Sequence, residues 1–161
     1  METKQRTMNI YFQFLTLDHS TLKPDNLSSQ YNVSLSTIEK DIHLIKEGML
    51  SYSYKGVTLP CYRIDYNKLT KEYTIHKANQ TVEIPKKYKA RFNCILLYRF
   101  VEYGLQLSLK DAQEMFDVSS YAINRYRITL SHTLKDAPRD DLYIPYNDFI
   151  YNEELEVFQL I

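Results

Sequence analysis

The chain has 161 residues, of which 44% are hydrophobic and 25% charged, the proportions of a folded globular protein rather than a disordered one. Its 20 basic and 20 acidic side chains give a net charge of zero, which argues against a non-specific nucleic-acid binder with a strongly basic surface. Only three glycines occur, no two of them close together, so a glycine-rich phosphate loop or dinucleotide fingerprint is excluded.

Targeting and membrane signals are missing from the sequence. Residues 1–12 have no apolar core followed by a small-residue cleavage site, and the longest apolar runs, such as 95–98, are far short of a membrane span. Cys61 and Cys94 are single and far apart, as expected of reduced thiols, and no CxxC spacing suggests zinc. We therefore expect a cytoplasmic protein with no membrane partner, no metal and no cofactor.

The first 50 residues predict three helices. Residues 6–17 carry apolar side chains at helical spacing. Pro24 favours the first turn of a short second helix that ends near Asn32. Ser34 can cap a third helix, which stops at Gly48, a residue suited to a left-handed helix end. A three-residue turn between the second and third helices makes a helix-turn-helix.

Residues 61–66 and 71–76 alternate apolar and polar side chains and are separated by the turn 67–70, a pattern that predicts a β-hairpin. Three helices followed by a hairpin are the plan of a winged helix. The following residues, 79–85, contain Pro85 and are predicted to form a linker.

The second half repeats this plan, with helices expected at 85–104, at 108–116 with Ser108 as cap, and at 118–134, and strands at 142–147 and 154–161. A shift of 85 residues superposes Val33 on Val118, Ser34 on Ser119, Ile38 on Ile123, Lys40 on Arg125, Tyr31 on Phe116 and Ile10 on Ile95. The hairpins align at a shift of 80, with 63–67 on 143–147. We therefore predict an α+β fold, mainly α, of two tandem winged helix-turn-helix domains, 1–78 and 86–161, joined by the linker 79–85.

Residues 27–50 resemble the winged helices of DeoR-type, WYL-type and Mga-type bacterial regulators, which use Leu-Ala, Val-Ser, Thr-Ile, basic-Asp-Ile and Gly-hydrophobic in that order. The matching residues are Leu27, Val33, Ser34, Thr37, Ile38, Lys40, Asp41, Ile42 and Gly48. Ser28 stands where alanine is usual, and Glu39 adds an acid at a variable position. The resemblance implies sequence-specific binding to double-stranded DNA in transcription regulation, in a bacterium or phage. Such a chain is either a stand-alone regulator or a piece of a longer one.

The candidate recognition helices are 34–47 and 119–134. At 100° per residue the first directs Ile38, Ile42, Ile45 and Met49 to the core and Ser36, Lys40, His43 and Glu47 outward. Glu39 falls on a flank and Asp41 at the core edge. Because recognition helices read bases mainly with their N-terminal residues, the expected DNA contacts are Leu35, Ser36, Thr37, Lys40 and His43.

In the second helix the expected DNA contacts are Tyr121, Asn124 and Arg125, since arginine and asparagine pair best with guanine and adenine. Arg127 occupies the slot of core Ile42, so the inward stripe must consist of Tyr126, Leu130 and Leu134. An exposed Ile128 also suggests contact with a protein.

Lysines elsewhere are expected to bind phosphates: Lys68 and Lys71 in the first hairpin turn, and Lys86 and Lys87 in a basic run that continues to Arg91. From Asp136 onward there are seven acids and one base. This acidic end is expected to avoid DNA and to suit a protein partner instead, and a homodimer is a further expectation.

Catalysis is not expected, because His19, His43, His76 and His132 are scattered without partners at metal-ligand or triad spacing. Two alternatives to a transcription regulator remain. Tandem winged helices also serve as protein-interaction adaptors, and replication initiators of plasmids and phages are built on similar pairs.

Overall fold

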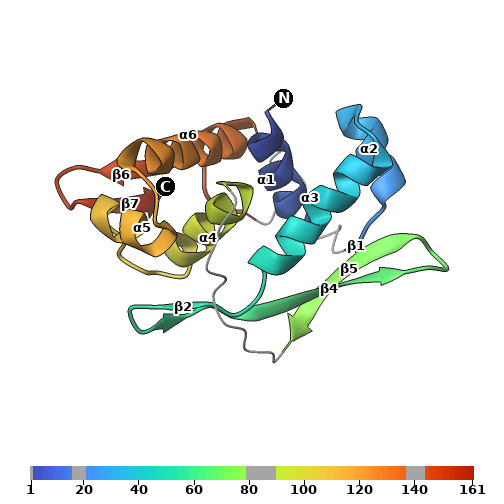
Figure 1. Ribbon diagram of the computed structural model, residues 1–161, viewed down its shortest axis with the longest axis horizontal. Coiled ribbons are helices and arrows are strands. Elements are labelled where there is room, and N and C mark those ends of the chain that lie inside the picture. The colour runs from blue at the N-terminus through green and yellow to red at the C-terminus, as the bar shows by residue number, and fades with distance from the viewer. Residues whose placement is uncertain (1, 16–20, 79–89, 137–143) are drawn as a thin grey trace.

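The computed structural model describes residues 2–15, 21–78, 90–136 and 144–161. Over these ranges the chain has an α+β fold that is mainly helical, with six helices and small antiparallel sheets (Figure 1). The helices are α1 (Thr3–Phe14), α2 (Pro24–Tyr31), α3 (Leu35–Gly48), α4 (Ala90–Glu102), α5 (Leu109–Phe116) and α6 (Ser120–Asp136). The strands are β1 (Thr21–Leu22), β2 (Ser53–Tyr54), β3 (Val57–Thr58), β4 (Cys61–Asn67), β5 (Glu72–Ala78), β6 (Phe149–Asn152) and β7 (Val157–Leu160).

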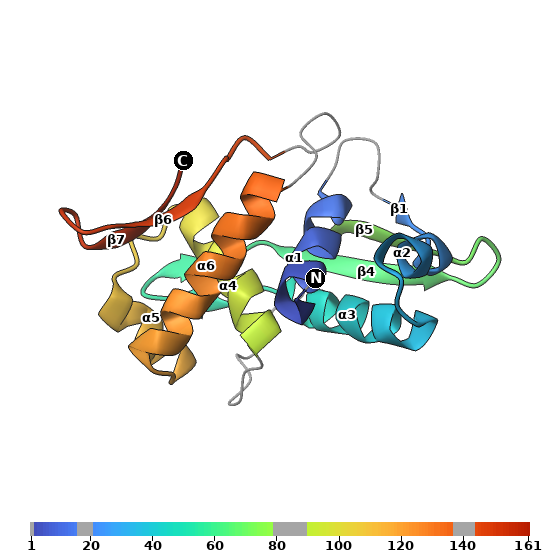
Figure 2. The same cartoon turned by 90° about the horizontal axis from the view of Figure 1, so that it is seen from above.

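Helices α1 and α4 lie side by side at the centre of the molecule (Figures 1 and 2). On one side of them lie α2, α3 and the β4–β5 hairpin, which together with α1 we call the first unit. On the other side lie α5, α6 and the β6–β7 hairpin, which together with α4 we call the second unit. The helices predicted from the sequence are therefore present, with ends shifted by a few residues.

The turn between α2 and α3 closes as the sequence predicted. Asn32 takes the left-handed conformation, with φ of 52°, which ends α2. The backbone N–H of Val33 donates to the carbonyl of Ser28 over 3.2 Å. The Ser34 hydroxyl then accepts from the N–H of Thr37, also at 3.2 Å, and so caps α3.

The turn between α5 and α6 repeats this geometry 85 residues later. Asp117 is left-handed, with φ of 51°. The N–H of Val118 donates to Gln113 over 3.3 Å, and the Ser119 hydroxyl accepts from the N–H of Ala122 over 3.2 Å. The shift of 85 found in the sequence thus holds for the turn, the cap and their hydrogen bonds.

The two hairpins follow the same shift of 85. In the first, Ile64 pairs with Ile75, the side chain of Asn67 accepts from backbone N–H groups of the turn, and Lys71 is left-handed. In the second hairpin, Phe149 pairs with Leu160 at the positions of Ile64 and Ile75. Asn152, the counterpart of Asn67, accepts from a backbone N–H of its turn, and Glu156, the counterpart of Lys71, is left-handed. The ring pairs Tyr66–Tyr73 and Tyr151–Phe158 also match, both with centroids 4.8 Å apart.

The shift of 80 predicted for the hairpins, and the strand at 142–147, are therefore wrong. Residues 144–147 are not a strand, and 142–143 lie outside the described residues. A Tyr-Asn pair occurs at both 146–147 and 151–152, and the predicted shift of 80 matches the first of these pairs to Tyr66 and Asn67. The preceding Pro145 has no N–H for a strand ladder, whereas Asn152 closes a turn, so the second pair is the true counterpart.

Strand β1 and the β2–β3 hairpin were not predicted from the sequence. Strand β1 pairs with β5 through Thr21–Thr74 and Leu22–Tyr73, which gives a three-stranded sheet in the order β1-β5-β4. The tight β2–β3 turn has Lys55 and Gly56 at positive φ. Strands of two residues are too short to show an alternating pattern, although Gly56 at the turn was a detectable signal.

Gly48 does not have the left-handed role predicted for it. It is the last residue of α3, and only Gly56 and Gly104 among the glycines have positive φ. A Cβ atom at Gly48 would lie 2.9 Å from the Cγ2 atom of Ile95 on α4. Gly48 is therefore needed for the close approach of α3 to α4.

Replacing Gly48 by alanine is expected to lower the free energy of unfolding by about 1–3 kcal/mol, the usual cost of overpacking a filled core. A Gly48→Ala, Ile95→Val double variant should recover part of this loss, because it removes the Cδ1 methyl group of Ile95, which would lie 3.3 Å from the added Cβ atom. Urea denaturation measures both. If Gly48→Ala and the wild type were equally stable, α3 and α4 could move apart to accommodate the added methyl group at no cost, and the close approach would not require glycine.

Both units contribute to one cluster of buried side chains. Helix α1 packs on α4 and α6, and α3 packs on α4. Buried Arg99 of α4 donates to the carbonyls of Gly48, Leu50 and Pro60 in the first unit. The predicted linker 79–85 lies outside the described residues, and the division into two domains stays a prediction. None of the described helices is long and apolar enough to cross a membrane.

Cys61 and Cys94 are both free and buried. Burial raises the pKa of the Cys94 thiol to about 12 from its ordinary value near 9.0. The stabilisation that comes from keeping this thiol neutral is therefore complete below about pH 9 and is lost as the pH rises from there towards 12.

A Cys61→Ser variant, in which Cys94 is the remaining thiol, is expected not to react with a disulfide reagent at pH 8 while folded. The thiolate is the reactive form, and the buried thiol stays protonated at that pH. In urea one thiol per chain should react. Reaction of the folded variant at the rate of a free thiol would contradict the burial of Cys94.

Candidate nucleic-acid interface

The outward face of α3 is arranged as its helical phase predicted. Ile38, Ile42, Ile45 and Met49 are buried, and the exposed residues of α3 are Leu35, Ser36, Glu39, Lys40, His43, Lys46 and Glu47. Lys40 has no carboxylate partner among the described residues. His43 lies 3.1 Å from Glu47, which offsets its charge when it is protonated. Lys40 and Lys46 are therefore the exposed cations of α3 that have no ion-pair partner among the described residues, and Lys40 lies nearer the middle of this face.

The N-terminal turn of α3 is used in part by its own cap. The Thr37 hydroxyl lies 2.8 Å from that of Ser34 and is half-buried, so it is less free for DNA than predicted. The Ser36 hydroxyl is exposed, 3.2 Å from that of Ser34. Leu35 is 41% exposed. Leu35 and Ser36 are thus the accessible members of the predicted base-reading set in this turn.

Asp41 is fully buried rather than at the core edge. Arg6 of α1 donates to it over 2.6 Å from Nε and 3.3 Å from Nη2, and the Thr7 hydroxyl lies 3.2 Å away. Arg91 of α4 also donates to this carboxylate. The Asp41 side chain thereby ties α3 to both α1 and α4, and these two attachments help to orient α3. No local pattern in the sequence reveals this cluster, because its members are far apart along the chain.

Arg91, at the end of the predicted basic run, donates to Asp41 and is therefore less free to bind a phosphate than predicted. Its guanidinium is half-buried against Asp41. Lys86 and Lys87, the other predicted phosphate ligands of that run, lie outside the described residues.

The β4–β5 turn carries Lys68 and Lys71, both exposed, and neither pairs with a carboxylate among the described residues. Between them Leu69 is 94% exposed, the most open of the large apolar side chains described. The Asn67 carboxamide fixes this tip by accepting from the N–H groups of Leu69 and Thr70. The structure thus presents two free cations on a defined turn.

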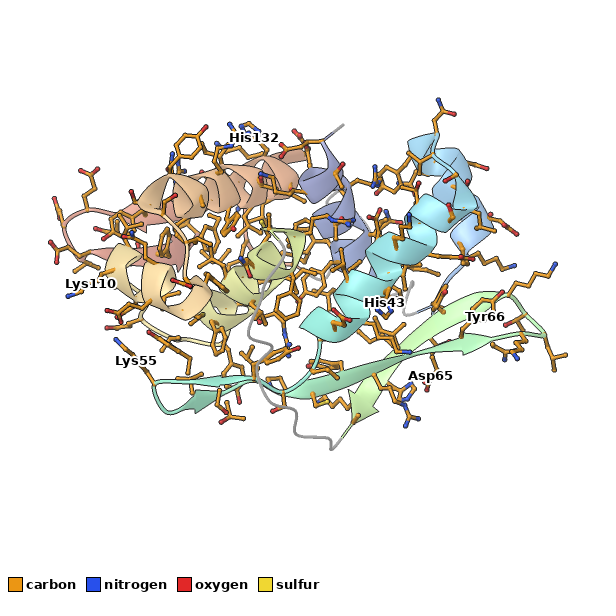
Figure 3. The ribbon with its side chains drawn as sticks, viewed as in Figure 1. His43, Lys55, Asp65, Tyr66, Lys110 and His132 are labelled. Atoms are coloured by element: carbon orange, nitrogen blue, oxygen red, sulfur yellow. The ribbon has the colours of Figure 1, made fainter. Side chains whose placement is uncertain are left out.

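Helix α6 offers a more basic face than α3. Tyr121 is 70% exposed, and Asn124, Arg125 and His132 are also exposed, His132 on the outer side of the helix (Figure 3). The sequence from 118 to 135 contains no carboxylate. As predicted, Tyr126, Leu130 and Leu134 are buried, whereas Ile128 is half-buried rather than exposed.

Two of these side chains are already coupled to each other. Arg127, which replaces a core residue of α3, donates from Nε and Nη2 to the Asn124 carboxamide oxygen, both over 3.2 Å. Asn124 could therefore pair with the N6 and N7 atoms of an adenine only after Arg127 releases this oxygen. Arg125 has no such partner among the described residues and is the freer of the two predicted base contacts.

The β6–β7 turn is the acidic counterpart of the β4–β5 turn. Glu153 and Glu156 stand 85 residues after Lys68 and Lys71. All four are exposed. Within the described ranges, the first unit thus carries unpaired cations on both its hairpin turn and its third helix, whereas the corresponding turn positions of the second unit are carboxylates.

A scan against protein-family models found no match, and neither did searches of curated proteins and solved structures. Within the described ranges, no group of three or more His, Cys, Asp and Glu side chains could hold a metal ion. The outward faces of α3 and α6 and the hairpin tips are therefore the features that bear on function.

Proposed function

We propose that this chain is a transcription regulator that binds double-stranded DNA sequence-specifically through two tandem winged helices. Each winged helix comprises three helices and a hairpin, with α3 and α6 as recognition helices. Lys40 and Arg125 read bases or hold phosphates, and Lys68 and Lys71 hold phosphates from the first hairpin.

The observation that carries the proposal is the equivalence of the two third helices. Each follows a three-residue turn closed by the same bonds, and each turns a cation at the same position, Lys40 or Arg125, to solvent. The N-terminal half of such a helix fits the major groove, and an arginine there can pair with guanine through two hydrogen bonds. The net charge of zero fits specific contacts between a few side chains and DNA bases better than non-specific electrostatic binding to nucleic acid.

Selection of bound sequences from a random duplex pool tests this proposal. We expect enrichment of a defined motif, with each mismatch in it costing about 1–3 kcal/mol. Absence of binding at low salt would reject both DNA-binding readings, regulator and replication initiator, and would favour a protein adaptor. Enrichment of sequences from an origin rather than from promoters, in a genomic pool, would favour the initiator.

The two hairpin tips are expected to differ in their effect on DNA binding. Replacing Lys68 and Lys71 together by alanine should reduce the slope of log K against log salt by about 2, because each lost phosphate contact removes about 0.9. The matched control replaces Glu153 and Glu156 by alanine, which should leave the slope unchanged or slightly steeper. Fluorescence anisotropy of a labelled duplex at several salt concentrations measures both variants. A similar slope for the two double variants would remove the first hairpin from the interface.

A further inference from the structure

The contacts between the two units are reciprocal. Helices α1 and α4, the first helices of the two units, pack directly on each other. Helix α1 also packs on α6, the third helix of the second unit, and α4 packs on α3, the third helix of the first. If the two units exchange places, the α1–α4 contact stays the same and the α1–α6 and α4–α3 contacts replace each other. Reciprocity of this kind characterises a twofold arrangement, whereas head-to-tail packing joins two different surfaces.

Individual residues repeat the same relation. Arg6 and Arg91 stand 85 residues apart at the same position of α1 and α4, and both donate to Asp41. Equivalent groups come this close together near a twofold axis. Likewise Gly48 of α3 meets Ile95 of α4, and their counterparts, Thr133 of α6 and Ile10 of α1, are both fully buried where α1 packs on α6.

The overall arrangement agrees with these contacts. In two perpendicular views α2 and α5 lie at opposite ends of the molecule, and the hairpins β4–β5 and β6–β7 extend in opposite directions from the central pair α1 and α4 (Figures 1 and 2). A contact between the β2–β3 hairpin and the second unit is also present: Lys55, at the tip of this hairpin and labelled in Figure 3, pairs with Asp111 at the start of α5.

We propose that the chain is an internal pseudo-dimer whose two units are related by an approximate twofold axis, so that one chain binds the two halves of an imperfect inverted repeat. This inference rests on the proposed function, which supplies duplex DNA as the ligand. A twofold arrangement presents α3 and α6 to the duplex in opposite orientations, as the subunits of a dimeric helix-turn-helix protein do on a palindromic operator.

The two halves of the repeat must differ in sequence because the reading side chains differ. Ser36, Glu39 and Lys40 in the first unit correspond to Tyr121, Asn124 and Arg125 in the second. Arginine prefers guanine more strictly than lysine, which also serves as a phosphate ligand. We therefore expect the half-site read by α6 to be the better defined of the two.

The test starts from the duplex enriched by selection. Native mass spectrometry should show one chain per duplex, and the enriched motif should contain two related half-sites in opposite orientation. Hydroxyl-radical footprints of Lys40→Ala and Arg125→Ala should then each lose protection over a different half-site. Both side chains are exposed, so each variant folds and serves as the control for the other.

The possible failures are distinguishable. If no duplex binds, the proposed function fails and this inference fails with it. If a duplex binds but the half-sites form a direct repeat, or both variants lose protection over the same half-site, the twofold reading is wrong and DNA binding stands. Two chains on one inverted repeat would also overturn the inference, because each chain would then read one half.

Discussion

Replacing Asp41 by alanine is expected to lower the free energy of unfolding by about 3–5 kcal/mol, the range found when one partner of a buried ion pair is removed. The Asp41 carboxylate is fully buried and holds Arg6 and Arg91 by charge-assisted hydrogen bonds. Its loss leaves the nearly buried guanidinium of Arg6 without a counter-charge. The same change removes the polar contacts that tie α3, the proposed recognition helix, to α1 and α4, and leaves the apolar packing between these helices.

Glu39→Ala is the matched control for this loss, because Glu39 is an exposed carboxylate on the same helix. It should change the free energy of unfolding by no more than about 0.5 kcal/mol. Urea denaturation followed by circular dichroism measures both variants. Equal stability of Asp41→Ala and Glu39→Ala would show that the buried cluster contributes nothing to the fold.

Arg91 and Arg6 should contribute unequally to this cluster. The side chain of Arg91 is 21% exposed and that of Arg6 is 11% exposed, so truncation of Arg91 leaves Asp41 with its better buried partner. A double-mutant cycle between Asp41 and Arg91 isolates the energy that joins the first unit to the second.

The second large effect concerns DNA. The double variant Lys40→Glu, Arg125→Glu is expected to weaken binding to the selected duplex at least about 100-fold, equivalent to about 2.7 kcal/mol. Each substitution removes a cation that is proposed to face the duplex and would place a carboxylate against phosphates. The two side chains are exposed, so the melting temperature should stay close to that of the wild type.

Comparison with Asp41→Ala separates the two kinds of effect. At a temperature where Asp41→Ala is still folded, it should bind the selected duplex far better than the double variant, because it is changed on the buried side of α3. If both proteins bind DNA equally well, the outward faces assigned to α3 and α6 are wrong.

Local signals in the sequence were sufficient to predict the helix-turn-helix pairs α2–α3 and α5–α6. Pro24, Ser34 and Ser108 each mark a helix start by chemistry that acts over one turn, and the structure places them there. The buried stripe of α3 followed from helical phase alone. The shift of 85 was also readable in the sequence, although the duplicated Tyr-Asn pair misplaced the second hairpin by five residues.

Contacts between distant segments could not be predicted in this way. Gly48 ends α3 as predicted, but it is required there by the approach of Ile95 in the other unit and not by a left-handed conformation. Arg91 looked like a phosphate ligand within a basic run, but the fold brings it to Asp41. Both errors have the same origin, since packing between the units decides the role of residues whose neighbours in the sequence suggest another.

The dependence of duplex affinity on salt tests the central claim, that the outward faces of α3 and α6 bind DNA. The wild-type chain is titrated against the selected duplex between roughly 50 and 200 mM salt, a range over which the affinity of DNA-binding proteins falls steeply. These titrations give the slope of log K against log salt. Lys40, Lys68, Lys71 and Arg125 predict a slope of about −3 to −4, at about 0.9 for each phosphate contact. No binding at the lowest salt concentration, or binding that does not change with salt, would contradict the account.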